Sequence, residues 1–208
     1  MRKLIITQFM TLDGVVQAPG GPTEDRSGRF THGGWSFTYW DEMMGKVMGD
    51  FMAPPFDLLL GHFTYKIFAG HWPKIPSADP TAAKLNSVKK YVVSKKRLKL
   101  EWNNSEQVAG NVVNAIKKLK AQDGPEIQVH GSGDLAQTLI KNGLVDEFQI
   151  FIFPVTIGKG KRLFAEGTRP EGFKLLDSKV STTGVIIARY APAGALKTGS
   201  FQLDEGKA

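Results

Sequence analysis

Cysteine is absent from the 208 residues of this chain. The absence excludes disulfides, thiolate metal sites and cysteine nucleophiles, and it suits a reducing compartment. The sequence also lacks an apolar run of transmembrane length, and the run that follows Met1 is too short for a signal peptide. We therefore expect a cytoplasmic protein with no membrane partner.

Metal-ligand spacing, internal repeats and clear linkers are missing as well. The four histidines are scattered, so we expect no metal site. Without a linker, residues 1–190 are expected to form a single domain. Residues 191–208 are rich in glycine and polar side chains and are expected to form an irregular tail.

Positive charge is in excess, with a net charge of +7 and an isoelectric point near 9.5. Residues 84–99 contain seven basic side chains and no acid. Aromatic residues do not interleave with them as a nucleic-acid stacking surface requires, so a small phosphorylated ligand is favoured over nucleic acid. The alternative is a non-catalytic nucleotide- or nucleic-acid-binding module that uses this basic segment.

The most informative stretch runs from Ile127 to Gly143 and has the pattern strand, glycine turn, helix, stop. Ile127 and Val129 alternate with polar residues, and apolar residues at helical spacing follow the turn Gly131-Ser132-Gly133. Glycines at a strand's end let a phosphate approach the backbone, and the following helix offers free N–H groups. This pattern predicts a nucleotide-phosphate site.

Two other strand ends carry similar chemistry. Gly61-His62 follows the apolar run 56–60 and begins another helix, with Thr64 as its expected cap. Ser94-Lys95-Lys96 ends the run 90–94, where the lysines are placed to hold a phosphate. Agreement among three strand ends favours nucleotide binding.

The remaining pattern predicts an α/β protein with a mostly parallel sheet and an antiparallel C-terminal hairpin. The expected strands are 3–9, 56–60, 90–94, 127–130, 147–155, 173–180 and 185–190. One helix is expected from about Tyr39 to Met52, and another is expected to begin at Asn104, with Gln107 completing a capping box. Residues 69–85 are expected to be loop, and the long loop 18–35 a lid or mobile segment.

An acid, Asp13, stands at the exit of the first strand, directly before Gly14. Open α/β sheets place ligand-contacting groups at such strand ends, but Asp-Gly is also a turn signal. Both interpretations stay open from the sequence.

Several segments together resemble one family. They are Thr11–Gly14, Gly61–Tyr65, Lys90–Ser94, Val129–Gly133, Leu144–Glu147 and Pro154–Phe164. With these segments the chain resembles a stand-alone member of the dihydrofolate reductase superfamily, similar to the reductase domain of bifunctional riboflavin biosynthesis proteins. The resemblance implies a three-layer α/β/α fold, NADPH as cofactor, a small pterin- or ribosylaminopyrimidine-like substrate reduced at C=N or C=O, and a homodimer.

The resemblance also implies roles for particular residues. The cofactor pyrophosphate would be met by the turn at Thr64 and by Gly131, Ser132 and Gly133, and Leu135 of the following helix would also bind the cofactor. Gly61 and His62 belong to the same cofactor site, with Ser94, Lys95 and Lys96 facing the adenosine 2′-phosphate.

Asp13 would lie near the nicotinamide and the substrate as the catalytic candidate, with Asp41 and Glu42 as rival proton donors. Two departures from the family are visible. His62 stands where the family has arginine, and the zinc-dependent deaminase half of the bifunctional protein is absent.

Overall fold

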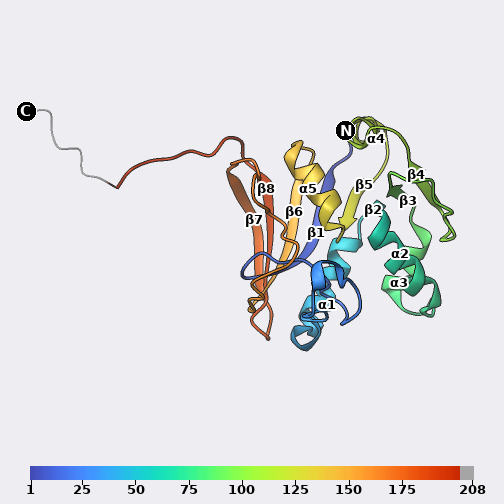
Figure 1. Ribbon diagram of the computed structural model, residues 1–208, viewed down its shortest axis with the longest axis horizontal. Coiled ribbons are helices and arrows are strands. Elements are labelled where there is room, and N and C mark those ends of the chain that lie inside the picture. The colour runs from blue at the N-terminus through green and yellow to red at the C-terminus, as the bar shows by residue number, and fades with distance from the viewer. Residues whose placement is uncertain (202–208) are drawn as a thin grey trace, which may run out of the picture.

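Eight strands form one mixed sheet in the computed structural model, which describes residues 1–201 of the chain. The strand order is β4-β3-β2-β5-β1-β6-β8-β7, which Figure 1 shows from right to left. The strands are β1 (Leu4–Thr11), β2 (Phe56–Gly61), β3 (Lys90–Val93), β4 (Ser105–Val108), β5 (Glu126–His130), β6 (Glu147–Phe153), β7 (Phe173–Val180) and β8 (Ile186–Pro192).

The first six strands in chain order are parallel to one another. β1 pairs in parallel with both β5 and β6, and β2, β3 and β4 continue the parallel part of the sheet. β8 is antiparallel to β6, and β7 pairs with β8 as the outer strand of a hairpin. The predicted fold class, mostly parallel with an antiparallel C-terminal hairpin, is confirmed.

Within residues 1–201, five α-helices cover the two faces of the sheet. They are α1 (Glu42–Met52), α2 (His62–His71), α3 (Pro80–Ser87), α4 (Val112–Ala121) and α5 (Gly133–Lys141). Short 3-10 turns occur at Ser27–Arg29, Phe37–Tyr39 and Trp72–Lys74. No helix within residues 1–201 combines the length and the apolar character needed to cross a bilayer.

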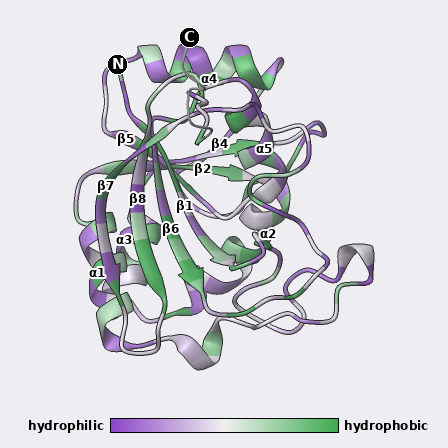
Figure 2. Ribbon diagram, turned by 90° about the vertical axis from the view of Figure 1, so that its left-hand side faces the viewer, coloured by the Kyte–Doolittle hydropathy of each residue, from purple (hydrophilic) through white to green (hydrophobic). Residues whose placement is uncertain are grey.

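Because side chains alternate along a strand, each face has its own core. On the face that we call the α5 face, α4 and α5 pack against Ile6, Ile127 and Val129. On the opposite face, called the α1 face, α1 packs on Phe151 and Phe153, while α2 and α3 pack on the even-numbered side chains of β2. Figure 2 shows how strongly apolar β6 and β8 are.

Three local predictions are wrong. Asn104 does not begin a helix; the residues after it form β4, and the helix begins only at Val112, with Asn111 as its cap. Pairing with β3 decides this, because β4 is in register with it along its whole length.

The segment 69–85 is not a continuous loop, since α2 extends into it and Asp79 caps α3 within it. Thr64 lies inside α2, whose N-cap is Gly61, so it does not cap that helix. At the C-terminus, β8 extends to Pro192, and residues 202–208 of the predicted tail lie outside the described residues.

Candidate nucleotide and substrate site

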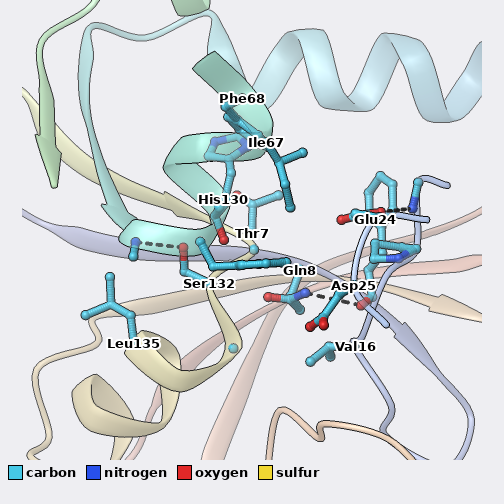
Figure 3. A pocket seen from close by; sticks show the side chains of 18 of the residues that line it. Thr7, Gln8, Val16, Glu24, Asp25, Ile67, Phe68, His130, Ser132 and Leu135 are labelled. Atoms are coloured by element: carbon cyan, nitrogen blue, oxygen red, sulfur yellow. Dashed lines mark hydrogen bonds between the residues drawn. The ribbon is translucent and has the colours of Figure 1, made fainter. Parts of the chain in front are cut away.

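A cavity of about 1080 Å³ opens at the carboxyl ends of the parallel strands, where ligands bind in open α/β sheets. Figure 3 shows side chains from β1, α2, α5 and the loop after β1 around it. All ten residues predicted to bind the cofactor line it: Gly61, His62, Thr64, Ser94, Lys95, Lys96, Gly131, Ser132, Gly133 and Leu135.

The two helices that begin at this cavity differ from the other three. The caps of α1, α3 and α4 are Asp41, Asp79 and Asn111, and each side chain accepts a backbone N–H in its helix. Neither α2 nor α5 has a side-chain cap hydrogen bond, although the first residues of both line the cavity. Their N–H groups and the positive ends of their dipoles are therefore available to an anion such as a phosphate.

Ser132 connects these two helix starts. Its backbone is left-handed, with φ of 62°, and its Oγ accepts a hydrogen bond from the Gly61 N–H at 2.9 Å. A Cβ at Gly61 would lie 3.4 Å from this Oγ, at the near limit of an ordinary van der Waals contact. The Ser132 side chain therefore lies directly against the start of α2.

The basic segment 84–99 is not a continuous positive surface. Lys90 is fully buried, with its Nζ donating to the carbonyls of Asn86 and Asn103 and lying over the Trp102 ring. Lys89 and Lys99 pair with Glu106 and Glu101. Of the seven basic side chains in the segment, only those of Lys95 and Lys96 line the cavity, and both are exposed. This distribution favours a local phosphate contact over a nucleic-acid surface.

Asp13 is not among the residues that line the cavity. Its carboxylate accepts hydrogen bonds from the Thr11 hydroxyl (2.6 Å) and from the N–H groups of Ile157 (3.2 Å) and Gly158 (2.7 Å). The Thr11 hydrogen bond, supported by these backbone donors, lowers the pKa of Asp13. Asp13 thus anchors the loop after β6 to the exit of β1, as in the turn interpretation.

The two rival acids also lie outside the lining. Asp41 caps α1 and also accepts from the backbone and hydroxyl of Thr182. Glu42 stands in the first turn of α1. Neither side chain lies in the cavity with the residues predicted to bind the cofactor.

The cavity instead contains two acids from the long loop after β1. Glu24 Oε2 accepts from the N–H groups of Gly20 (2.6 Å) and Gly21 (3.2 Å), and burial raises the pKa of this carboxyl. Burial also acts on Asp25, but hydrogen bonds from Ser27 and Lys161 outweigh it and lower the Asp25 pKa. The loop is tied down by this Asp25–Lys161 pair, at 2.9 Å.

Two buried side chains of the cavity were not assigned a role from the sequence. Gln8 is 3% exposed, and its Oε1 has no hydrogen-bond partner within the described chain. His130 is stacked on Phe56, and burial lowers its pKa to about 4. A polar residue inside an apolar strand was the only signal for Gln8, and no pattern pointed to Glu24.

Within the described residues, no group of three or more His, Asp or Glu side chains is arranged to hold a metal ion.

The comparison with known proteins agrees with the fold. Residues 2–187 match the family described as "RibD C-terminal domain". The chain belongs to this family.

The similarity covers most of the length of two relatives. YyaP of Bacillus subtilis strain 168, an uncharacterized protein, is 28% identical over 194 residues, covering 91% of this chain and 94% of YyaP. A structure from Shewanella sp. PV-4, ascribed by name to riboflavin biosynthesis, superposes with a TM-score of 0.68 at 21% identity, covering 91% of this chain and 98% of that one.

Two further structures extend the comparison to named reductases. Dihydrofolate reductase from Enterococcus faecalis, in complex with NADP(H), has a TM-score of 0.57 at 13% identity, with 92% of this chain and 96% of that one covered. The deaminase/5-amino-6-(5-phosphoribosylamino)uracil reductase of Thermotoga maritima has a TM-score of 0.59 at 14% identity, with 92% of this chain and 56% of that one covered. At these identities the likeness shows the dihydrofolate reductase-like fold.

Proposed function

We propose that the protein is an NADPH-dependent reductase that transfers a hydride to a small heterocyclic substrate at a C=N or C=O bond. One observation carries the proposal: two helix starts without side-chain caps meet at one cavity, joined by the Ser132–Gly61 hydrogen bond. Membership in the RibD C-terminal domain family supports a reductase, and the likeness to an NADP(H)-bound dihydrofolate reductase supports this cofactor.

The residues present fit the cofactor. The free N–H groups at the starts of α2 and α5 suit a pyrophosphate, although Asp134 in the first turn of α5 adds a negative charge nearby. The exposed ammonium groups of Lys95 and Lys96 suit the 2′-phosphate. The unpartnered Oε1 of Gln8 suits an N–H donor, such as the carboxamide of a nicotinamide.

The bound cofactor would supply the hydride, so the chain needs no nucleophile of its own. Its residues hold the reactants in the cavity, limit access of water and deliver a proton to the reduced atom. Glu24 is the proton donor that we favour, because its carboxyl lines the cavity and its raised pKa retains a proton better than an exposed glutamate does.

Titration of the full chain with NADPH, NADH and ADP-ribose, followed by calorimetry and NADPH fluorescence, tests the proposal. We expect saturable binding of all three, tightest for NADPH. Absence of NADPH binding would contradict the reductase assignment. A gel-shift titration with DNA and RNA at two salt concentrations addresses the alternative module, for which we expect only weak, salt-sensitive association.

A further inference from the structure

A glutamine at the edge of the sheet binds the backbone of the loop that carries Lys95 and Lys96. β4 is the last strand at this edge (Figure 1). Gln107 on β4 is in register with Val92, which belongs to the α1-face core, so the Gln107 side chain points to that face. Its Oε1 accepts a hydrogen bond from the Leu98 N–H (3.0 Å), and its Nε2 donates to the Lys96 carbonyl (2.7 Å). One side chain therefore holds the loop backbone at two points.

An amide is the side chain that this geometry requires. It offers a donor and an acceptor on one planar group, as a peptide unit does, and each of them meets its complementary backbone group. A carboxylate at position 107 would turn a second acceptor toward the Lys96 carbonyl, and an apolar side chain would form neither bond. Gln107 thus pairs with the loop as the backbone of a further strand would.

The backbone of Lys96 is fixed at both of its polar groups. Its N–H donates to Ser94 Oγ at 3.1 Å, while its carbonyl accepts from Gln107. Within residues 1–201, no other hydrogen bond connects Lys95–Leu98 to the rest of the fold. Beyond this stretch the chain returns to the core, where Trp102 is buried. Ser94 and Gln107 therefore set the path of a loop that is otherwise open to solvent.

The two lysines of this loop are available to a ligand. Lys95 and Lys96 line the cavity and are exposed, and neither forms an ion pair within the described residues. Gln107 itself is not part of the lining. A lysine is a point charge on a flexible stem, so the backbone beneath it decides which positions the charge can reach. A backbone that is ordered before the ligand arrives also removes part of the entropy cost of binding.

We propose that Gln107 is a positioning residue for cofactor selectivity: it holds Lys95 and Lys96 where their ammonium groups meet the 2′-phosphate of NADPH. This inference rests on the proposed reductase function and adds to it a residue that touches no ligand. The anion-binding starts of α2 and α5 belong to other segments. Loss of the Gln107 amide should therefore lower the preference for a 2′-phosphorylated ligand without weakening the binding of a ligand that lacks this phosphate.

The test uses two ligands that differ by one phosphate, 2′-phospho-ADP-ribose and ADP-ribose. Both are titrated by calorimetry into the full-length wild type, into Gln107→Met and into Gln122→Met. Methionine keeps the length of the side chain without its amide, and Gln122 is an exposed glutamine outside the cavity lining that serves as the matched control. We expect the wild type and the control to prefer the phosphorylated ligand by roughly tenfold, and Gln107→Met to reduce this preference roughly fourfold with unchanged ADP-ribose affinity.

A double-mutant cycle separates positioning from a general loss of stability. When Lys95 and Lys96 are both replaced by alanine, Gln107→Met should have no further effect on the affinity for 2′-phospho-ADP-ribose, because no ammonium group remains to be placed. A second measurement needs no variant. In the wild type the Leu98 amide, which Gln107 holds, should exchange its hydrogen more slowly than the Lys95 amide, which has no partner within the described chain.

Three results would each overturn the inference: an undiminished preference in Gln107→Met, an equal loss when both lysines are already alanine, or a Leu98 amide that exchanges as fast as that of Lys95. The same titrations distinguish the two proposals. A wild type that binds both ligands equally rejects the role of Gln107 and leaves a reductase that uses NADH. A wild type that binds neither ligand rejects the reductase, and this inference with it.

Discussion

The Gly61 N–H donates a hydrogen bond of 2.9 Å to the Ser132 hydroxyl, at the carboxyl ends of β2 and β5. This bond holds the N-termini of α2 and α5 in one site. These residues are 71 positions apart in the chain. Since neither helix has a side-chain cap of its own, this bond sets the spacing of the two anion-binding ends.

Removal of that hydroxyl is the first prediction. Ser132→Ala should lower the free energy of unfolding by about 1–2 kcal/mol, because a polar N–H loses its partner. NADPH binding should weaken by roughly fivefold as the two helix ends lose their fixed spacing. Denaturant unfolding and fluorescence titration measure the two effects. Ser87→Ala, at an exposed serine of α3, is the control; an equal loss of NADPH affinity there would contradict the role of Ser132.

Cofactor selectivity is the second prediction. Lys95→Ala combined with Lys96→Ala should weaken NADPH binding tenfold or more and leave NADH nearly unaffected, since only NADPH carries the 2′-phosphate. Lys99→Ala removes an exposed lysine that is paired with Glu101 and serves as the control. Equal losses for NADPH and NADH would place these lysines away from the 2′-phosphate.

The sequence revealed the parts of the site that depend on local signals. The alternation of Ile127 and Val129, followed by a glycine turn, located β5 and the start of α5 within a residue or two. It missed β4, because Ser105–Val108 has no apolar alternation and becomes a strand only by pairing with β3. It also missed α3, whose signal, Asp79 followed by Pro80, is hidden among other prolines.

The cavity side chains also divide into those that local sequence signals predict and those whose position depends on the tertiary fold. Strand-end residues such as Lys95 and Gly131 were predicted from their position alone, and they line the cavity. Glu24 could not be found, since its place in the cavity depends on how an aperiodic loop folds back. His130 was not assigned a role, because its burial against Phe56 depends on the pairing of β5 with β2.

Asp13 gives the third prediction. Both of its oxygens accept backbone N–H groups, so an asparagine would turn an N–H donor toward Gly158 or Ile157. We expect Asp13→Asn to lower the free energy of unfolding by about 1–3 kcal/mol while turnover per folded molecule stays close to the wild-type value.

The pH dependence checks this role. The folded-state pKa of Asp13 is lowered, so its contribution to stability is present above the ordinary value of 3.8 and is lost as the pH falls through the folded pKa. The gap in unfolding free energy between wild type and Asp13→Asn should therefore narrow in acid. A stable variant with a much lower kcat on a confirmed substrate would instead restore the catalytic interpretation.

Oligomeric state is the fourth prediction. The homodimer implied by the family resemblance has a suitable surface on the α5 face of the hairpin, where Leu175, Val180 and Ile186 are 50%, 64% and 43% exposed. We propose that this apolar surface is covered in a dimer. Leu175→Asp with Val180→Asp should yield a monomer in light scattering, whereas Lys179→Asp, on the opposite face of β7, should not. A monomeric wild type at micromolar concentration would contradict the proposal.

Glu24 carries the final prediction. Burial raises the pKa of Glu24 in the folded state. The free energy of unfolding therefore falls as the pH rises from the ordinary pKa of 4.5 to the folded pKa, because the carboxyl ionises more readily in the unfolded chain. A glutamine retains an oxygen that can accept from Gly20 and Gly21 but cannot ionise. Glu24→Gln should therefore match the wild type in unfolding free energy well below pH 4.5 and exceed it at neutral pH.

The same substitution removes the proton that we assign to the reaction. With NADPH bound, Glu24→Gln should reduce kcat and kcat/KM together and leave the NADPH affinity intact, because the loss falls on the chemical step. The wild-type rate should decline as the pH rises through the Glu24 pKa, since the carboxyl must be protonated to act as the acid, and this decline should vanish in the variant. Glu166→Gln, at an exposed carboxyl, should change neither stability nor rate. A variant that gains stability at neutral pH yet keeps full turnover would leave Glu24 as a loop-ordering residue and assign the proton to water in the cavity.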